Sequence, residues 1–386
     1  MTSRDSKTNP PIYLDHNAMG LLDPEFRELW LELSSHPLGN PSSYHSYGRR
    51  ARNLIGEART IVAEIFAVRP KQVLFCSGGT ECLNQLLFHI LNTQNGHIVT
   101  SQTEHAAVYH TIKRRAQQSD ARWRATFLTP NPTGEIAVSA VEQAIAPDTR
   151  LIALMAANNE TGVLNPLEEI GHLVQGRGIP LLVDAVAYIG KAPFTSFNTA
   201  SAVCFSGHKL NAPPGTGIAI LRPPFDELTP LLYGGPQEFG RRAGTENALS
   251  IYLAAQALKK AVNNEREVQG DTARRRDALV AKIRTALPSS IYHGEGAPHT
   301  CNVANLAFPG VDGETLLIHL DQLGVMASHG SACQSGALEP SRVLLGMGIE
   351  RSLVEASIRF SLSPMTTDDE IDRAAHIIIR AVELSS

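Results

Sequence analysis

A lysine, an aspartate and a histidine in this sequence each follow closely on an apolar run that reads as a strand. Lys209 comes after "SAVCFSGH", Asp184 ends "PLLVD" and His105 follows "HIVTSQTE". A lysine at the end of a buried strand is costly to desolvate unless it has a chemical task, such as forming a Schiff base with an aldehyde cofactor. For Lys209 taken alone, a surface lysine at a strand exit is the structural alternative.

The residues around this lysine favour pyridoxal phosphate as the aldehyde cofactor. Its pyridine nitrogen needs a carboxylate that keeps the ring protonated and able to accept electrons, and Asp184 could supply one. The segment "CSGGTE", residues 76–81, predicts a strand, a glycine turn and a helix start, where backbone N–H groups and the Thr80 hydroxyl could hold a phosphate. His105 could stack on the ring or move protons. If these strand ends share one edge of an α/β sheet, they form one ligand site.

The elements that must position these residues alternate along the first two thirds of the chain. Apolar strands alternating with helical segments predict parallel crossovers and a central α/β sheet. A helix is expected over residues 52–66, with Leu54, Ala58, Ile61, Val62 and Ile65 on its apolar face. After about residue 260 the pattern changes: residues 254–287 predict one long helix, and the rest resembles a smaller α+β domain. Strands are expected in residues 72–77, 97–101, 125–130, 150–157, 180–186 and 201–207.

Composition and charge exclude several function classes. Of 386 residues, 43% are hydrophobic and 19% charged, as is normal for a soluble globular protein. The formal net charge is −4 and no long basic run occurs, so direct nucleic-acid binding has no electrostatic footprint. The apolar runs are too short for a membrane span, and the start "MTSRDSKTNPP" lacks the apolar region of a signal peptide.

Five cysteines are present, and Cys333 differs from the rest in its surroundings. It lies in "ASHGSACQSGALEPS", residues 327–341, among small residues that permit many backbone conformations. The odd count and the absence of a CxxC pair argue against a disulfide framework or a metal site, so we expect no metal and a cytoplasmic location. The other four are expected to act as small hydrophobic residues: Cys76, Cys82, Cys204 and Cys301.

The ordered motifs of the chain resemble those of the NifS/IscS-type cysteine desulfurases, which are fold-type I pyridoxal phosphate enzymes of the class V aminotransferase family. The "GSAC" motif is typical of the group that carries its cysteine on a long, swinging loop. The resemblance spans Tyr13 to about residue 372 and rests on "YLDHNA", "GNPSSYHSYG", "SGGTE", "TEHAAV", "NNETGV", "VDAV", "SGHK", "RRAGTEN", "GSACQSGALEPS" and "SIRFSLS".

This resemblance implies an aspartate aminotransferase-like α/β fold with two domains. The large domain would hold a mostly parallel seven-stranded sheet and bind the cofactor, and we place it at residues 16–262. The smaller α+β domain would comprise residues 1–15 and 263–386 and would carry the cysteine loop at about 327–341.

The resemblance also implies the reaction and the catalytic roles. Lys209 would form the Schiff base with pyridoxal 5'-phosphate, Asp184 would pair with the pyridine nitrogen, and His105 would stack on the ring and relay protons. Cys333 would take the sulfur of L-cysteine as a persulfide, leaving L-alanine, and pass it to an acceptor protein. Arg359 would hold the substrate carboxylate, because a guanidinium grips a carboxylate with two hydrogen bonds.

Further binding residues are implied in the same way. Asn40 would assist Arg359, and Asn159 would lie near both the substrate and the phenolic oxygen of the cofactor. Thr245 would reach the phosphate of a neighbouring subunit, which implies a homodimer with shared active sites. The phosphate of the chain's own cofactor would be held by Gly79, Thr80, Ser206 and His208.

Four positions depart from the family pattern. Ala187 stands where a glutamine would hydrogen-bond the phenolic oxygen, Phe239 replaces an arginine, and Ala18-Met19-Gly20 replaces "ATT". His329 replaces a serine; when protonated it could lower the pKa of Cys333, or it could be a solvated loop histidine. These departures leave open a related C–S lyase or selenocysteine lyase, and a non-catalytic homologue that acts as an interaction partner.

Overall fold

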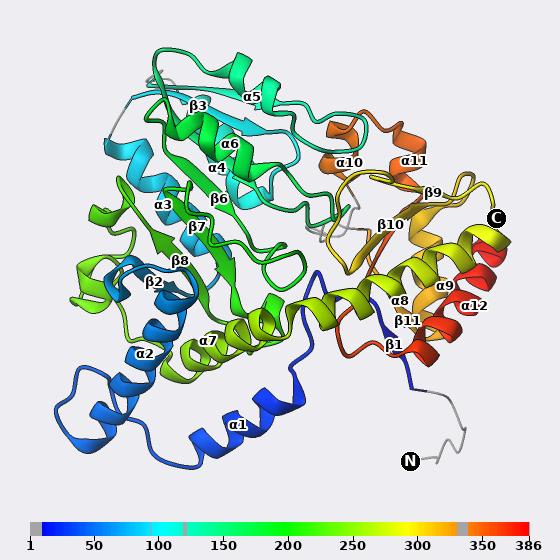
Figure 1. The fold of residues 1–386 in the computed structure, drawn as a ribbon. Helices are drawn as coiled ribbons and strands as arrows, with labels where there is room; N and C mark the ends of the chain where they lie inside the picture. The colour runs from blue at the N-terminus through cyan, green and yellow to red at the C-terminus, as the bar shows by residue number, and fades with distance from the viewer. Residues whose placement is uncertain (1–9, 94, 119–121, 330–338, 386) are drawn as a thin grey trace.

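The computed structural model describes residues 10–93, 95–118, 122–329 and 339–385, and its largest element is a seven-stranded sheet (Figure 1). The strand order is β2-β8-β7-β6-β5-β3-β4. Neighbouring strands pair in parallel except around β8, which is antiparallel to both β2 and β7. The predicted mostly parallel seven-stranded sheet is therefore confirmed. Its strands are β2 (Val73–Cys76), β3 (Gly96–Ser101), β4 (Trp123–Leu128), β5 (Thr149–Met155), β6 (Leu181–Asp184), β7 (Ala202–Ser206) and β8 (Gly217–Leu221).

This topology brings the carboxyl ends of six strands to one edge of the sheet. Because β8 reverses direction between β2 and β7, those two strands run parallel to each other and to the rest. The turn after β2, Asp184 at the end of β6 and Ser206 at the end of β7 therefore lie along the same edge. Ligands of open α/β sheets bind at this edge, so the fold itself collects the predicted site residues.

Helices cover both faces of this sheet, which explains its nearly continuous apolar strands. Alternate strand residues such as Phe75 and Val183 belong to one core cluster, while Leu74 and Leu182 belong to another on the opposite face. The first cluster lies under α2 (Ser46–Ile65), α5 (Val138–Ala144), α6 (Leu167–Gln175) and α7 (Ala248–Asn263); the second lies under α3 (Gly79–Thr93) and α4 (Ala106–Ala116).

The buried face of helix α2 differs slightly from the apolar face predicted for it. The helix begins at Ser46, well before residue 52, and the side chain of its N-cap residue His45 accepts a hydrogen bond from Gly48 N. Its buried residues include Ala51, Ile55, Ala58, Val62 and Ala63, whereas Leu54, Ile61 and Ile65 are half-buried at the margin. The helix prediction is thus confirmed. The face that packs against α7 is turned by about one residue from the predicted apolar face.

A second, antiparallel sheet forms a separate core with three long helices. Strand β10 (Val303–Ala307) lies between β9 (Ile291–Tyr292) and β12 (Ser357–Ser361), and β1 (Ile12–Tyr13) pairs with β11 (Val325–Met326). Ile12 and Leu14 belong to this core, although they are far from its other members in sequence. The predicted domain boundaries stay a prediction. The helices are α8 (Glu265–Ala286), α9 (Gly313–Leu323) and α12 (Asp368–Ser385), and the remaining ones are α1 (Pro24–Ser34), α10 (Arg342–Gly346) and α11 (Arg351–Glu355).

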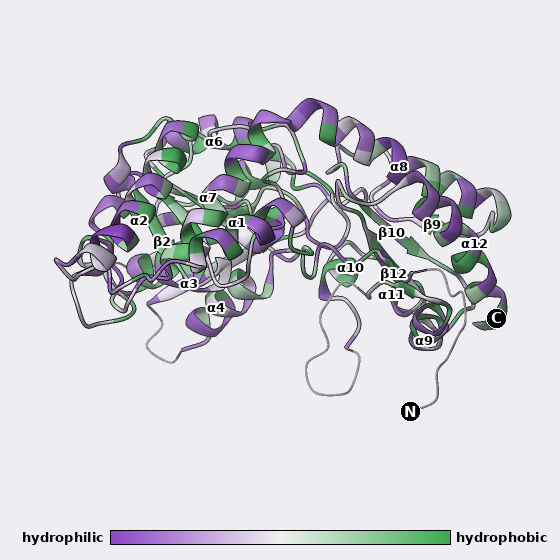
Figure 2. Ribbon diagram, turned by 90° about the horizontal axis from the view of Figure 1, so that it is seen from below, coloured by the Kyte–Doolittle hydropathy of each residue, from purple (hydrophilic) through white to green (hydrophobic). Residues whose placement is uncertain are grey.

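The expected single helix over residues 254–287 is wrong. Helix α7 ends at Asn263 and α8 begins at Glu265, with Asn264 between them in a non-helical conformation (φ −104°, ψ 16°). Asparagine side chains compete with the backbone for hydrogen bonds, and Glu265 and Glu267 suit the positive end of a new helix. In Figure 1 the two helices follow one another, α7 beside the large sheet and α8 beside β10, and hydrophilic residues predominate along the first half of α8 in Figure 2. Within the described residues, no helix is long and apolar enough to cross a membrane.

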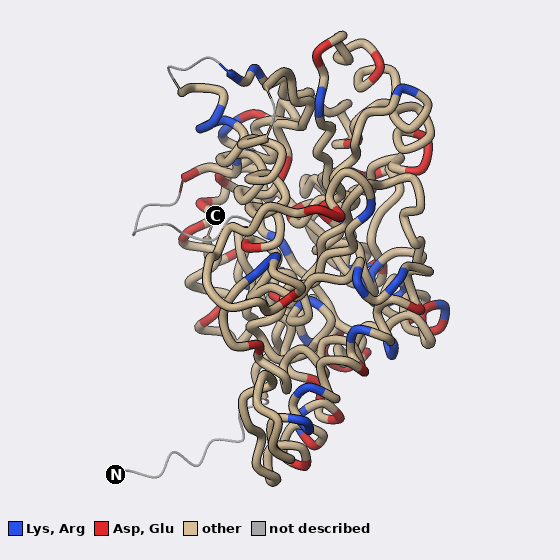
Figure 3. Tube along the Cα trace, turned by 90° about the vertical axis from the view of Figure 1, so that its left-hand side faces the viewer, with Lys and Arg blue, Asp and Glu red and all other residues tan. Residues whose placement is uncertain are grey.

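A buried ion pair fastens α2 to the large sheet. Arg59 Nη2 lies 2.5 Å from Glu238 Oε1, and Glu238 Oε2 accepts a hydrogen bond of 2.9 Å from Phe75 N. Glu238 (φ 50°) and Phe239 (φ 61°) both have left-handed backbones, and the guanidinium groups of Arg59 and Arg241 lie 5.1 and 5.2 Å from the Phe239 ring. Other charges interleave over the surface (Figure 3), where ion pairs such as Arg124–Asp148 are exposed.

We expect Glu238→Gln to destabilise the protein, because it leaves the Arg59 charge buried without its counter-ion. Breaking a buried pair on one side typically costs about 3–5 kcal/mol. Urea denaturation of the purified protein measures the change. Asp148→Asn, in the exposed pair with Arg124, is the matched control and should leave the midpoint unchanged because water screens that contact. Equal midpoints for the two variants would contradict the importance of the buried pair.

Candidate active site

Lys209 lies in a short 3₁₀ helix (Gly207–Leu210) that follows β7 directly. A Cβ on Gly207 would lie 2.7 Å from the Ala254 Cβ of α7, so glycine permits this turn to pack closely on the helix. The Lys209 Nζ donates hydrogen bonds of 2.5 Å to Asn17 O and 2.6 Å to Ala18 O. Burial, with the nearby charge of Arg359, lowers the pKa of Lys209 to about 8. About a fifth of this amine is therefore neutral at pH 7.4, far more than for an ordinary lysine.

Asp184 is buried at the end of β6, next to Lys209 and His105. Its Oδ1 accepts a hydrogen bond of 3.0 Å from Val186 N. Burial raises the pKa of Asp184, while the positive charges of His105 and Lys209 act in the opposite direction. A buried carboxylate in this setting is complementary to a cationic ring nitrogen.

His105 is held at the N-terminus of α4. Its Nδ1 accepts a hydrogen bond of 3.2 Å from Ala107 N, which leaves Nε2 as the ring nitrogen that can donate a proton. The preceding residue, Glu104, is fully buried, and burial raises its pKa to about 8. Glu104 Oε1 accepts hydrogen bonds from Met155 N and Ser101 Oγ, both 3.0 Å long. Sequence reasoning missed Glu104, although it stands within the motif "TEHAAV".

The N-terminus of α3 and the end of β7 provide donors for an anion. Helix α3 begins at Gly79, and its first N–H groups have no partner within the helix. A Cβ on Gly79 would lie 2.9 Å from Val186 Cγ2, so glycine keeps this approach open, and Thr80 beside it is exposed. Ser206 Oγ lies 2.8 Å from His208 Nδ1. Burial lowers the pKa of His208 to about 4, so its ring is neutral.

Arg359, on β12, is anchored on several sides. Its Nη2 contacts Asp15 Oδ1 and Ser328 Oγ, both at 2.8 Å, and its Nη1 donates to Asn159 O at 3.0 Å. The side chain is almost fully buried. Asp15 was not predicted as a site residue, and its signal was its place in the motif "YLDHNA". The carboxylate-binding role of Arg359 stays a prediction.

Two predicted site residues lie apart from this group in the single chain. Asn40 is exposed in the loop before α2, and its Oδ1 accepts a hydrogen bond from Ser42 N. In Figure 1 the loop between α1 and α2 is at the other end of the molecule from β10. Thr245 is also exposed, between the Gln237–Gly240 turn and α7. Cys333 lies outside the described residues.

Comparison with known proteins agrees with the geometry. The family described as aminotransferase class-V matches residues 12–374. Cysteine desulfurase 2 of Trichormus variabilis is 37% identical over 375 residues, which cover 96% of this chain and 93% of the relative. The NifS cysteine desulfurase of Azotobacter vinelandii is 36% identical, covering 94% of this chain and 90% of the relative. The chain belongs to the NifS/IscS-type cysteine desulfurases of the class-V aminotransferase family.

The three-dimensional likeness extends over the same length. A solved structure described as a NifS-like protein matches with a TM-score of 0.88 at 29% identity and covers 97% of this chain and 100% of that one. Class-V aminotransferases and cysteine desulfurases use pyridoxal phosphate, and so does this desulfurase. The predicted family and fold class are thereby confirmed.

The residues present fit this cofactor. Lys209 could bond the aldehyde, the buried carboxylate of Asp184 would complement a ring nitrogen, and the start of α3 with Ser206 and His208 would suit the phosphate. Asn159 Oδ1 is buried without a hydrogen-bond partner among the described residues, so its amide remains available to a ligand. Ala187 is buried and has no side-chain donor for the phenolic oxygen.

His329 and Phe239, two of the unusual positions, have definite surroundings. His329 is half-buried rather than solvated, and its Nδ1 lies 2.8 Å from Ser357 O, which fixes the ring next to β12. Phe239 is 63% exposed and makes the cation–π contacts described above. Any effect of His329 on Cys333 stays a prediction, because the thiol is outside the described residues.

We expect cofactor-free desulfurase to form its imine with pyridoxal phosphate at a rate that rises with pH and levels off above about pH 8. The reacting form is the neutral Lys209 amine, whose pKa is about 8, so the rate should fall about tenfold per pH unit well below that value. Stopped-flow absorbance of imine formation measures the profile. Lys209→Ala should abolish the signal. A rate that still climbed tenfold between pH 8.5 and 9.5 would show an ordinary, unperturbed lysine.

Proposed function

We propose that this protein is a pyridoxal phosphate-dependent L-cysteine desulfurase that forms L-alanine and leaves the substrate sulfur as a persulfide on Cys333. The observation that carries the proposal is the Lys209 amine of lowered pKa, beside buried Asp184, in a chain whose curated relatives are named cysteine desulfurases. No observation favours a lyase or a non-catalytic role.

Lys209 acts as the base at the substrate Cα. Bound pyridoxal phosphate supplies an electron sink for the electron pair left on that carbon. When Lys209 takes up the proton, its ammonium group can donate to Asn17 O and Ala18 O, the two carbonyls it already contacts. The carbonyls thus stabilise the protonated base without a carboxylate that would hold the proton permanently.

His105 and Arg359 orient the reactants. Because His105 Nδ1 is occupied by Ala107 N, the ring is fixed and its Nε2 is the nitrogen that can pass a proton. Arg359 is kept in place by Asp15, Asn159 O and Ser328, and a substrate carboxylate would join these partners at a preorganised guanidinium.

The sulfur transfer needs a thiolate, and the four described cysteines are poorly suited to provide it. Burial raises the pKa of Cys204, and that of Cys301 to about 11, while the pKa values of Cys76 and Cys82 lie well above the usual range for a thiol. Cys333 is the remaining cysteine of the chain. Its thiolate would attack the substrate sulfur: the C–S bond breaks, an S–S bond forms, and the C–S electron pair stays with the carbon fragment, which takes up protons to become alanine.

The described residues that flank Cys333 in sequence are fastened beside the active site. Ser328 forms backbone hydrogen bonds with Arg359 in both directions. On the other side, Ser341 Oγ donates to Glu160 Oε2 at 2.5 Å, next to Asn159, and Arg342 donates to the carbonyl oxygens of Gln102 and Glu104. Both anchors support delivery of the Cys333 thiol to this site.

A homodimer with shared sites is part of the proposal. Large aromatic side chains are exposed on the single chain, including Tyr44 at 88% and Tyr233 at 76%, and such groups are common at protein interfaces. The exposed residues Asn40 and Thr245 lie in the same two segments, where a second copy could bring them to its own active site. We further propose that the sulfur acceptor is another protein and that the enzyme works in the cytoplasm, consistent with the free thiols of the described cysteines.

We expect Cys333→Ala to lower the formation of alanine from L-cysteine at least about a thousandfold, because the variant lacks the nucleophile. The cofactor absorbance should be unchanged. Quantifying alanine and persulfide measures the outcome, with Cys82→Ala as a matched control that keeps full turnover. Undiminished turnover of Cys333→Ala, with sulfide or pyruvate as products, would instead identify a C–S lyase.

We expect Tyr233→Asp to weaken dimer association at least about tenfold, because a charge replaces an aromatic side chain at the interface. Sedimentation velocity over a range of micromolar concentrations measures the equilibrium. Leu384→Asp, at an exposed position on α12, is the control and should remain dimeric. A wild-type chain that sediments as a monomer throughout would refute the shared-site dimer.

A further inference from the structure

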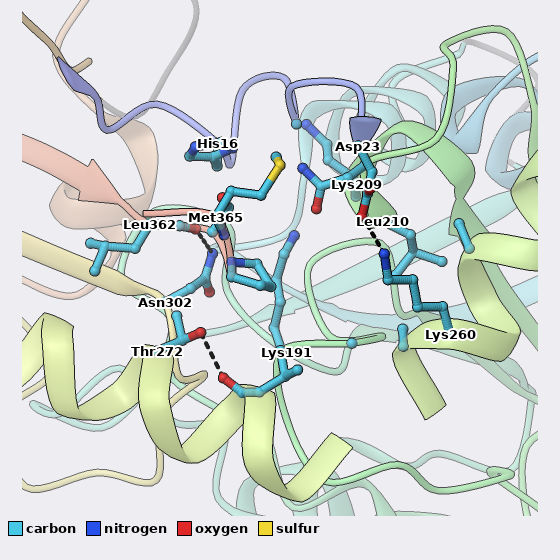
Figure 4. A pocket seen from close by; sticks show the side chains of 18 of the residues that line it. His16, Asp23, Lys191, Lys209, Leu210, Lys260, Thr272, Asn302, Leu362 and Met365 are labelled. Atoms are coloured by element: carbon cyan, nitrogen blue, oxygen red, sulfur yellow. Dashed lines mark hydrogen bonds and ion pairs between the residues drawn. The ribbon is translucent and has the colours of Figure 1, made fainter. Parts of the chain in front are cut away.

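A cavity of about 100 Å³ is lined by Lys209 but not by Asp184 or the phosphate-binding residues (Figure 4). Of the site residues discussed above, Lys209 alone among the described ones lines it. Its wall includes the turn at Lys191, the end of α7, the beginning of α8 and the chain that leaves β12. Asn264 and Pro364, which are exposed, and partly exposed Lys260 lie at its rim, so the cavity can exchange with solvent.

Three buried polar atoms around this cavity lack a hydrogen-bond partner among the described residues. They are Lys191 Nζ, His16 Nδ1 and Asn302 Oδ1. All three side chains line the cavity and are grouped around it in Figure 4. The amide of Asn302 is oriented by hydrogen bonds from its Nδ2 to Asn17 Oδ1 and Leu362 O, so the unpartnered Oδ1 is an acceptor. Unpaired polar atoms in such a place are costly unless a ligand or solvent satisfies them.

Lys191 differs from Lys260, the lysine at the rim, in its charged neighbours. Lys260 Nζ contacts Asp23 Oδ2 and Glu25 Oε2, each at 2.7 Å. Among the described residues, no carboxylate forms an ion pair with Lys191, and the cations Lys209 and Arg359 both act to lower its pKa. Burial, together with the Lys209 charge, lowers the pKa of Lys191 to about 7. Its backbone is fixed by hydrogen bonds to Tyr188 O and from Cys301 N, so the side chain stays directed at the cavity.

The unpartnered groups match the two charged ends of an amino acid. An ammonium group such as Lys191 Nζ complements a carboxylate. Asn302 Oδ1 and a neutral His16 ring complement an ammonium group, and burial lowers the pKa of His16 to about 4, which keeps that ring neutral. Apolar neighbours such as Val268 and Leu362 suit a small side chain. A water-sized atom needs roughly 10–15 Å³ by this measure, so the cavity has room for about seven such atoms, the number of non-hydrogen atoms in cysteine.

We propose that this cavity is a second ligand site, which binds a small zwitterionic α-amino acid with its carboxylate on Lys191 and its ammonium group on Asn302 Oδ1 and His16. The class of ligand follows from these contacts alone. That the ligands in the cell are cysteine or alanine rests on the proposed function, because those are its substrate and its product. Since Lys209 lines the cavity, a bound amino acid lies against the residue that carries the reaction.

Equilibrium dialysis of the holoenzyme with radiolabelled L-alanine, compared with the cofactor absorbance change over the same titration, tests the proposal. Two molecules should bind per chain, one of them without any absorbance change. Lys191→Met should weaken this spectroscopically silent site at least about tenfold, since a charge-assisted hydrogen bond is lost. Lys259→Met removes an exposed charge from the neighbouring surface of α7 and should leave both sites intact. L-cysteine, measured by competition, shows which amino acid the silent site prefers.

Several results would overturn the assignment. One alanine per chain would show that no second site exists, and a silent site that survives Lys191→Met would place it elsewhere. Displacement of alanine by acetate as effectively as by unlabelled alanine would show a carboxylate site without amino-acid recognition. Failure of the proposed function would show differently, as absent cysteine turnover in the wild type, and would leave the silent site unaffected.

Discussion

The active site depends on the mutual repulsion of three cationic side chains that are largely buried and interact with one another. Lys209, Arg359 and Lys191 each raise the cost of charging another: Arg359 lowers the pKa of Lys209, and Lys209 lowers that of Lys191. Asp15 pairs with Arg359, and the charges of Asp15 and Asp184 act in the opposite direction on the pKa of Lys209. The carboxylates therefore offset the lowering of the Lys209 pKa only in part. A lysine that must alternate between neutral and protonated forms gains from this imbalance, because its neutral form becomes accessible near neutral pH.

The segment from Ile12 to Ala18 is hydrogen-bonded to both sheets next to these cations. Strand β1 pairs with β11, and Asn17 N donates to Ser361 Oγ of β12, which ties the segment to the smaller sheet. Asn17 Nδ2 donates to Asn159 O, while the carbonyls of Asn17 and Ala18 accept from Lys209 after β7 of the large sheet. Lys209 and Arg359 come from different sheets, so their relative position depends on these short hydrogen bonds.

Much of the fold and part of the site could be predicted because they depend on local pattern. Strands buried on both faces leave continuous apolar runs, and the residues after them must share an edge once the strands are parallel. Hence Asp184, Ser206 and Lys209 are found where the sequence indicated. The break at Asn264 was not predicted, because helical periodicity continues on both sides of it and tertiary packing decides where each helix ends. The partners of Arg359 were equally inaccessible, since Asp15 is 344 residues away in the sequence.

The break between α7 and α8 has a consequence beyond the course of the chain. Helix α7 packs in the core beneath the large sheet, and α8 packs in the core beneath the smaller one. Because the helices part at Asn264, their adjoining ends form one wall of the cavity beside Lys209, and residues after β12 form another. A ligand there would touch elements that belong to both cores, including the short helix that carries Lys209. A ligand bound in this cavity would therefore contact both the short helix of Lys209 and the segment that follows β12, the strand that carries Arg359.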